Sequence, residues 1–550
     1  MKADLTRVTF NPFKHFTRVL IQQGRVDNEA DSNEQTAILL HYLQTLAADI
    51  IGPHGGPVND PGFAIGPASP NDFLIGAGHY YVAGVLCENA GTVLPIIPPV
   101  STPPPSADQV QIPTIWVDGC EFEPGQYVQI TSAASPPAAF SPTLAQISDV
   151  DAENCILTLN QTNPDFQKAA NKPMLQRVTT YLTQPDFPVP ADQDLLDSSS
   201  YQVYLDVWER DINYLQDDSI REVALGGPDT ASRAKLVSQV KVTATKSGAS
   251  CMKPQDLEAL FQKPSRGRLR ARSNIISLPL DPCTISPSAK YRGPENQLYR
   301  VEVHRPGQAW DGKNSTKANA ATFKFSRDNG SIVFAIRSLA TDSPSNTTTL
   351  TLESLGHDDR LGLTEGDWVE IQDDDYLFQN RAEPLLHVTA INRSAMQVVL
   401  SGQPATGVGT ISARHPLLRR WDQQQGDPNG NGLELSDGAA LIEEGDTWVN
   451  LEDGVQIEFL AAETGQSMSY RTGDYWLIPA RVATGSVEWP IALDENGNPV
   501  QDSNGNTIPI AMPPKGVIHH YAPLAVISLD ATGGVTATTC QLHFSSLATP

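Results

Sequence analysis

The chain has 550 residues, which is too long for one hydrophobic core, so we expect about three or four domains. Its formal net charge of −25 argues against a nucleic-acid partner and against peripheral binding to an anionic membrane, because such surfaces attract basic proteins. The 43 prolines and 40 glycines are typical of many short strands. Together with the residue patterns described below, the composition predicts a mainly β, multidomain fold of small antiparallel barrels or sandwiches, with an N-terminal extended arm and one clear helix.

Residues 1–56 predict an arm followed by a helix, and we expect this segment to serve in assembly. The arm combines aromatic, aliphatic and basic side chains that need a surface to lie on. Two interpretations remain open: the arm packs on its own domain, or it docks on a partner subunit. The candidate interface residues are Phe10, Phe13, Phe16, Arg18, Leu20, Ile21 and Arg25.

The helix has both a start and a stop signal. Ser32 and Gln35 have the spacing of a capping box, in which each side chain satisfies a free backbone donor. Gly52-Pro53 ends the helix, because proline cannot continue the hydrogen-bond ladder. Between these signals the apolar residues recur at helical spacing and form one stripe. The stripe consists of Ile38, Leu39, Tyr42, Leu43, Leu46 and Ile50.

Turn-rich stretches divide the rest of the chain. In the region 57–107 we expect a hairpin turning at Gly76 and Gly78, followed by a proline-rich connector without a strand or helix of its own. Asn329-Gly330 predicts a second hairpin between strands at 321–325 and 332–336. The further predicted segments are a β module at 108–195, a central β domain at 196–345, a second β module at 346–410 and a C-terminal β domain at 411–550.

The two β modules are predicted to be copies of one unit. Residues 125–130 match residues 366–371, and the similarity continues at the same offset of 241 residues to Leu159 and Leu400 without a gap. Each copy is predicted to contain three short antiparallel strands whose aliphatic residues face inward. The ungapped length favours duplication over a chance resemblance between unrelated β modules.

The cysteines indicate a reducing environment. They lie far apart without a Cys-x-x-Cys pair, which predicts neither a zinc site nor a disulfide framework. The N-terminus has no apolar signal region, and no run of about 18 apolar residues is present. We therefore expect synthesis and assembly in the cytoplasm. The six cysteines are Cys87, Cys120, Cys155, Cys251, Cys283 and Cys540.

Several polar groups resemble metal sites. The stretches 427–431 and 494–506 are rich in oxygen ligands, yet they lack the bidentate glutamate and the flanking helices of a calcium loop, so tight turns are the preferred interpretation. His519 and His520 are neighbours on a predicted strand and point to opposite faces. We expect one to be buried and the other exposed, and we predict no metal and no cofactor.

No enzymatic motif stands out, and the sequence predicts a protein that is not an enzyme. The carboxylates Asp206, Glu209, Asp367 and Glu370 could each serve a glycosidase, but none is distinguished among 63 acidic residues. Tryptophans on strands could stack on sugars, although such residues more often belong to a core. These tryptophans are Trp208, Trp368, Trp421, Trp448 and Trp476.

Several stretches resemble a little-characterised bacterial family whose members are encoded with contractile injection systems, the phage-tail-like particles. The resemblance begins at Leu5-Thr-Arg-x-Thr-Phe10 and extends over nearly the whole chain. It departs at Ser32, where the family usually carries tryptophan. The other matching stretches are 221–230, 322–330, 448–459, 475–481 and 519–524.

The resemblance implies a structural part of the baseplate end, a peripheral, cage-like or fibre-like component. Its partners would be other subunits of the particle, and a homo-oligomer, either a trimer or a ring, is expected. Such a particle is either released or anchored to a membrane. The alternative is a particle-borne protein that binds or cleaves carbohydrate.

Overall fold

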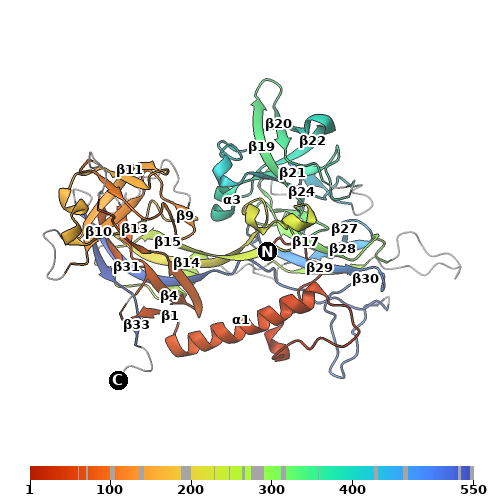
Figure 1. Ribbon diagram of the computed structural model, residues 1–550. Helices are drawn as coiled ribbons and strands as arrows, with labels where there is room; N and C mark the ends of the chain where they lie inside the picture. The colour runs from red at the N-terminus through yellow and green to blue at the C-terminus, as the bar shows by residue number, and fades with distance from the viewer. Residues whose placement is uncertain are drawn as a thin grey trace. The chain divides into compact units, whose positions relative to one another are not determined.

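A computed structural model (Figure 1) contains the 550-residue chain. No helix among the described residues is both long and apolar enough to cross a membrane. The described residues are 1–59, 61–69, 72–98, 106–134, 141–187, 200–227, 229–246, 248–262, 267–273, 290–310, 317–356, 358, 360–426, 432–461, 469–503, 505–530 and 534–545.

The fold is mainly β and multidomain, as expected from the sequence. The chain divides into two compact units. Unit 1 comprises residues 1–39, 209–235 and 264–518, and unit 2 comprises residues 40–208, 236–263 and 519–550. The helices are α1 (Glu29–Ile51), α2 (Pro254–Phe261) and α3 (Asp374–Gln379). Single 3₁₀ turns occur at Pro12–Lys14, Pro164–Gln167, Ala169–Asn171, Asp218–Ile220, Val223–Leu225, Lys317–Asn319, Arg393–Ala395 and Ser412–Arg414.

Unit 1 contains a closed barrel and two further sheets (Figure 1). The barrel strands, in order around it, are β19 (Val333–Asp342), β20 (Thr347–Leu352), β23 (Gln397–Ser401), β22 (Leu385–Asn392), β21 (Trp368–Gln372) and β24 (Leu417–Trp421). A six-stranded sheet has the order β25 (Leu435–Ser436), β26 (Ala439–Leu441), β18 (Thr322–Ser326), β17 (Gln297–Val303), β29 (Tyr475–Arg481) and β30 (Ser486–Val487). The third sheet is β16 (Leu269–Ser273), β28 (Val455–Phe459) and β27 (Val449–Asn450). The six-stranded and three-stranded sheets share one core, which includes Tyr299, Phe323, Phe459 and Trp476.

The described residues of unit 2 form four sheets. The largest has the order β2 (Ile65–Ser69), β3 (Asp72–Ile75), β13 (Pro173–Thr180), β10 (Tyr127–Ser132), β11 (Thr143–Asp151), β12 (Ile156–Leu159) and β7 (Gln109–Gln111), with β6 (Val93–Pro95) also paired to β13. One four-stranded sheet has the order β33 (His543–Phe544), β1 (His54–Pro57), β4 (Gly78–Val82) and β5 (Val85–Asn89). A second has the order β15 (Arg233–Ala244), β14 (Ser200–Ile212), β31 (His520–Leu529) and β32 (Val535–Thr539). The smallest is β8 (Trp116–Val117) with β9 (Cys120–Glu121).

The two copies of the predicted repeat share one strand order, although copy 2 lies in the closed barrel and copy 1 in the largest sheet of unit 2. Strands β7-β12-β11-β10-β13 in copy 1 follow the same order as β20-β23-β22-β21-β24 in copy 2. The register shifts between Ile147 and Asp149 in copy 1, and between Val388 and Ala390 in copy 2, which are the positions 241 residues further on. A bulge fixes the twist and bend of a strand pair, so its retention supports duplication. The sequence pattern revealed three strands in each copy, and the structure adds the two outer ones.

Two predicted hairpins are wrong, because the strands before and after each predicted turn pair with other strands. The tight turn after β4 lies at Ala83-Gly84 and pairs β4 with β5, whereas β3 pairs with β2 and β13. At Asn329-Gly330 the chain does turn, with φ of 53° and 71°, but β18 joins the six-stranded sheet and β19 joins the barrel. The proline-rich connector also contributes the short strand β6.

One disulfide corrects the prediction that the cysteines form no cross-link. Cys251 and Cys540 are bonded within unit 2, across 289 residues of sequence. Among the described cysteines, Cys87, Cys120 and Cys155 are free thiols. Cys283 lies outside the described residues.

Candidate assembly interface

The N-terminal arm is held to the first turns of α1 by polar contacts. The backbone N–H of Thr6 donates to Glu29 Oε1 at 3.0 Å, and the Thr9 hydroxyl donates to Glu34. Further along, the backbone N–H of Val19 donates to Gln35 Oε1 at 2.8 Å. These contacts use backbone and hydroxyl groups of the arm, so they do not require its apolar side chains to be buried.

The same contacts explain why the predicted capping box is wrong. The helix begins at Glu29, and the Asn28 side chain accepts from the backbone N–H of Ala30. Ser32 therefore lies inside the first turns, and Gln35 accepts from the arm instead of from the helix start. The predicted stop is confirmed, because α1 ends at Ile51 and Gly52 has a φ of 98°.

The arm leaves most of its predicted interface residues exposed. The side chain of Phe13 is 85% exposed and that of Leu20 is 69% exposed. Phe10 is half-buried. Within the described chain, therefore, the arm does not bury its apolar groups, although exposed groups of this size are costly in water. The other exposed members of the predicted set are Phe16, Arg18, Ile21 and Arg25.

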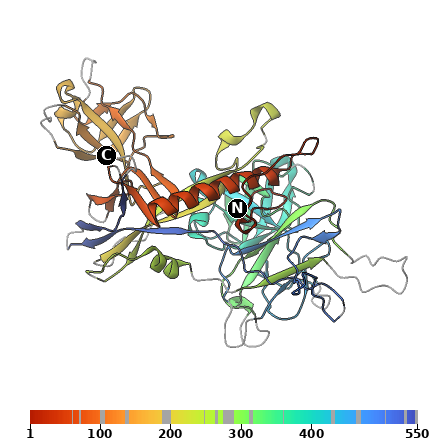
Figure 2. The same cartoon turned by 90° about the horizontal axis from the view of Figure 1, so that it is seen from below.

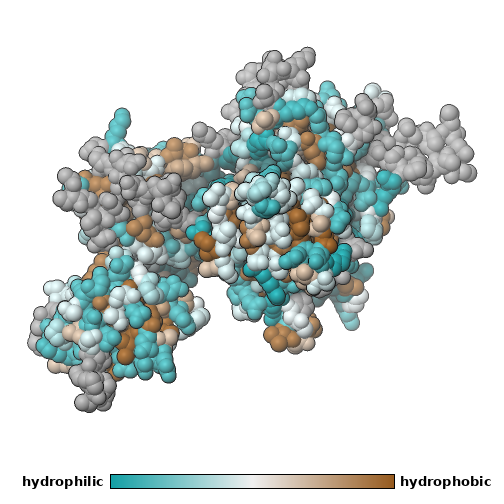
Figure 3. All heavy atoms as spheres, turned by 90° about the horizontal axis from the view of Figure 1, so that it is seen from above, coloured by the Kyte–Doolittle hydropathy of each residue, from teal (hydrophilic) through white to brown (hydrophobic). Residues whose placement is uncertain are grey.

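The outer face of α1 is also apolar and exposed. Of the predicted stripe, only Ile38 is buried, and it lies on the inner face together with Ala30. Figure 2 shows α1 turned toward the viewer along its length. By contrast, on the coloured part of the face drawn in Figure 3 the hydrophobic patches are interrupted by hydrophilic residues. The exposed part of the stripe is Leu39, Tyr42, Leu43, Leu46 and Ile50, with Leu40 beside it.

The first residues of the arm, unlike the rest, belong to a buried ionic network in unit 1. Lys2 Nζ lies 3.0 Å from Glu302 Oε1, and the Asn329 side-chain amide donates to the carbonyl oxygen of Ala3 at 2.8 Å. Burial lowers the pKa of Lys2 to about 7, although Glu302 opposes that shift. The start of the chain is therefore part of the fold of unit 1.

The centre of this network is the ion pair between Lys324 and Glu370. Lys324 Nζ lies 2.6 Å from Glu370 Oε2 and 3.6 Å from Glu302 Oε1. Glu370 also accepts from the Trp421 indole at 3.0 Å and the Tyr376 hydroxyl at 2.8 Å. Burial alone would raise the pKa of Glu370, but Lys324 and its neighbours lower it to about 2. All these groups are buried and mutually satisfied, which is the arrangement of a structural network.

The acids considered for a glycosidase do not converge. Asp206 is buried and pairs with Lys241 Nζ at 2.7 Å and with His519 Nδ1 at 2.6 Å. Asp367 accepts from the backbone N–H of Thr364, as in a turn, and Glu209 is exposed. Glu370 belongs to the ionic network just described.

The other candidate sites are likewise structural. His519 and His520 are both partly buried, which corrects the prediction of one buried and one exposed histidine. Asp494 accepts from the backbone N–H of Asn498, so this stretch is a tight turn as preferred, and 427–431 lies outside the described residues. Among the described residues, no group of three or more His, Cys, Asp or Glu side chains could hold a metal ion. Trp208, Trp421 and Trp476 are buried, while Trp368 and Trp448 are partly buried.

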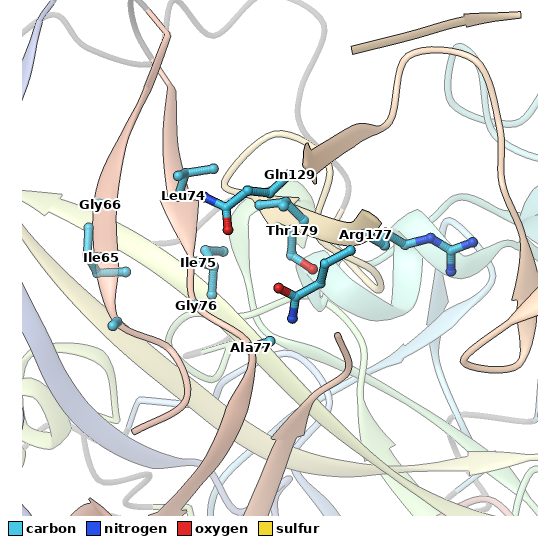
Figure 4. A pocket seen from close by; sticks show the side chains of 12 residues that line it. Ile65, Gly66, Leu74, Ile75, Gly76, Ala77, Gln129, Arg177 and Thr179 are labelled. Atoms are coloured by element: carbon cyan, nitrogen blue, oxygen red, sulfur yellow. The ribbon is translucent and has the colours of Figure 1, made fainter. Parts of the chain in front are cut away.

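One surface hollow of about 230 Å³ lies between β3 and β13 in unit 2 (Figure 4). Gln176 and Thr179 line it, but the Gln176 amide donates to the carbonyl oxygen of Gly91 and the Thr179 hydroxyl donates to Asn89. Arg177 points away from the hollow. Its lining contains neither an aromatic ring nor a carboxylate, the groups that bind or cleave sugars.

A second polar cluster in unit 1 contains carboxyl groups with raised pKa values. Burial raises the pKa of Glu452 to about 7, against the opposing effect of Arg327 at 2.8 Å. Burial and the neighbouring Asp422 raise the pKa of Asp328 to about 6. A raised pKa means that the folded state binds protons which the unfolded state has released.

We therefore expect Glu452→Gln to become more stable relative to the natural protein as the pH rises from about 5 to 8. The folded-state stability linked to protonated Glu452 is complete below its unfolded pKa and is lost as the pH passes about 7. The difference should grow by on the order of 2 kcal/mol. The comparison must be made within this pair, because burial lowers the pKa of His304 to about 4 and gives an opposite trend at lower pH. Urea denaturation at pH 5, 6, 7 and 8 measures the difference in unfolding free energy between the two proteins. A difference that stays constant over this range would contradict the prediction.

The fold and the candidate interface define a multidomain β protein with an exposed apolar arm and helix face, and with no convergent catalytic groups among the described residues. The sequence profile of a family of unknown function, DUF6519, matches residues 1–104, 191–268 and 249–549. The chain therefore belongs to this family. The matched segments include copy 2 of the repeat but not copy 1. No curated protein and no solved structure matches the chain.

Proposed function

We propose that the protein is a structural component of a contractile, phage-tail-like injection particle, a peripheral baseplate, cage or fibre-like subunit held in place by its N-terminal arm. The observation that carries this proposal is the exposure of Phe13 and Leu20 on an arm that is already ordered by polar contacts. An ordered arm loses little conformational entropy on docking, so burial of its apolar groups contributes more fully to binding.

The charge of the arm supports a protein partner. The first 26 residues contain five basic residues and one acidic residue, in a chain whose net charge is −25. Arg18 and Arg25 are exposed and have no ion-pair partner among the described residues. They can therefore steer the arm to an acidic subunit surface and form ion pairs at the rim of the contact. The resemblance to a family encoded with contractile injection systems supplies the kind of particle.

The disulfide supports service outside the cytoplasm. The bond between Cys251 and Cys540 persists in oxidising surroundings, whereas cytoplasmic thiols are kept reduced. A subunit that is made and assembled in the reducing cytoplasm, and then carried on a released or membrane-anchored particle, would form this bond once the particle is in oxidising surroundings.

The test is incorporation of the full chain carrying Phe13→Asp and Leu20→Asp into particles. We expect co-sedimentation with purified particles to fall at least about tenfold, since each large apolar side chain contributes about 1.5–3 kcal/mol when it is buried. Deletion of the arm is a poor substitute, because Lys2 belongs to the ionic network of unit 1.

The matched control is Val223→Asp with Leu225→Asp. These side chains are 85% and 66% exposed, close to the values of Phe13 and Leu20, but they lie on a 3₁₀ turn outside the arm. The control should be incorporated normally. Normal incorporation of the arm variant, or equal loss in both variants, would contradict docking through the arm.

A further inference from the structure

The exposed stripe of α1 has the spacing of a coiled-coil seam. Leu39, Leu43, Leu46 and Ile50 are separated by four, three and four residues, and each is between 53% and 62% exposed. Alternating steps of four and three residues place one apolar row along a helix, where it fits against another such row. The inner face of α1 is already packed, so this seam is a second apolar face on a helix that is already folded.

We propose that this seam pairs with the seam of α1 in a second copy of the chain, with the two helices antiparallel. The pairing deepens the assembly role proposed above by naming one partner, and it uses α1 rather than the arm. An antiparallel alignment that places Leu43 against Leu46 of the second copy also places Leu39 against Ile50. Every position of the seam then meets an apolar residue of the other helix.

The residues beside the seam fit the same alignment. Tyr42 comes next to Asp49 of the second copy, so that the phenol hydroxyl can donate to a carboxylate, a strong type of hydrogen bond. Asp49 is exposed and has no ion-pair partner among the described residues. On the other flank, the large side chain of Leu40 comes next to the small Ala47. The face is thus self-complementary, which is the requirement for a two-fold symmetric contact.

Charge distinguishes the antiparallel from the parallel arrangement. The first turns of α1 carry Glu29, Asp31 and Glu34. A parallel pair would place the acidic turns of both copies side by side, whereas an antiparallel pair keeps them apart and opposes the helix dipoles favourably.

The contact needs no helix nucleation, because α1 is already folded on its inner face. A seam of two heptads buries less than the roughly 800 Å² per partner of a typical stable complex, so the isolated pair should be in concentration-dependent equilibrium with the monomer. In a particle with many copies, such weak contacts act together.

Sedimentation of the whole protein at several concentrations tests the pairing. We expect a monomer–dimer equilibrium for the natural protein and a dissociation constant at least about tenfold higher for Leu43→Glu, because two carboxylates would be buried at the seam. Thr45→Glu adds the same charge at an exposed position off the seam and should leave the equilibrium unchanged. A natural protein that remains monomeric at high concentration, or a Leu43→Glu variant that dimerises normally, would overturn the proposal.

Disulfide cross-linking tests the orientation. A Leu39→Cys variant mixed with an Ile50→Cys variant should form a cross-linked dimer that neither variant forms alone. In the antiparallel pair the two copies of residue 39 are about 16 Å apart along the axis, too far for a disulfide. Cross-linking of each variant alone would indicate a parallel pair and refute the proposed alignment. The natural protein controls for its own exposed thiol at Cys120.

The two proposals fail separately. Loss of dimerisation in Leu43→Glu together with normal particle incorporation of Phe13→Asp/Leu20→Asp supports the α1 pairing and contradicts the arm's role. A monomeric natural protein whose incorporation still depends on the arm gives the opposite result.

Discussion

Replacing Lys324 by methionine is expected to lower the free energy of unfolding of unit 1 by about 3–5 kcal/mol. The methionine has nearly the volume of the lysine, so packing changes little. The carboxylate of Glu370, which is 0% exposed, would however lose the lysine cation that lies 2.6 Å away. Breaking a buried ion pair on one side leaves an uncompensated charge, which costs far more than the pair contributes. Urea denaturation followed by tryptophan fluorescence, with calorimetry to separate the two units, measures the loss.

Two further variants make this prediction specific. Lys324→Met combined with Glu370→Gln removes both charges and should recover at least half of the lost stability, because a neutral pair is tolerated where a single charge is not. Lys324 pairs with a glutamate and lies over the ring of Trp421. Lys317 is a matched surface control, because it pairs with Glu434 and lies over the ring of Trp310 but is exposed. Lys317→Met should cost less than about 1 kcal/mol. Equal losses for Lys317→Met and Lys324→Met would show that burial is not the cause.

Removing the disulfide, by Cys251→Ser with Cys540→Ser, is expected to destabilise unit 2 by about 2–5 kcal/mol. The bond spans 289 residues, so it restricts the unfolded chain over a long loop. It also joins Cys540, which follows β32, to Cys251, which precedes α2, and so it holds together two segments that are remote in sequence. Calorimetry under non-reducing conditions should show a lower transition temperature for unit 2 and an unchanged one for unit 1.

A reducing agent provides the internal control for this prediction. It should lower the stability of the natural protein to that of the double serine variant and should not affect the variant itself. Cys120→Ser, which removes an exposed free thiol, should change stability by less than about 0.5 kcal/mol. A natural protein whose unfolding is insensitive to reduction would contradict the structural role of the bond.

The repeat and the helix could be predicted because their signals are local. The two β modules share strand alternation and turn spacing over 35 positions, and the structure shows matching bulges at Ile147 and Val388. The end of α1 at Ile51 follows from the backbone restrictions of the next two residues. The start of the helix was misplaced because Gln35 serves the arm at Val19, a contact between segments 16 residues apart.

The exposure of the candidate interface could be predicted only in part. The apolar and basic character of the arm is evident in the sequence, but whether Phe13 is covered by its own domain depends on the fold, and the structure leaves it exposed. The participation of Lys2 in a buried network has no local signal, since its partner Glu302 lies about three hundred residues away.

The sequence by itself determined the mainly β class, the duplicated module, the position of the one long helix and the apolar, basic character of the arm. Each of these features depends on neighbours within a few residues. Only the tertiary structure decided which strands pair across the turns at Ala83 and Asn329, which lysines and glutamates meet in the core, and that Cys251 reaches Cys540. Those outcomes depend on the free energy of bringing distant segments together, and that free energy is a property of the whole folded chain.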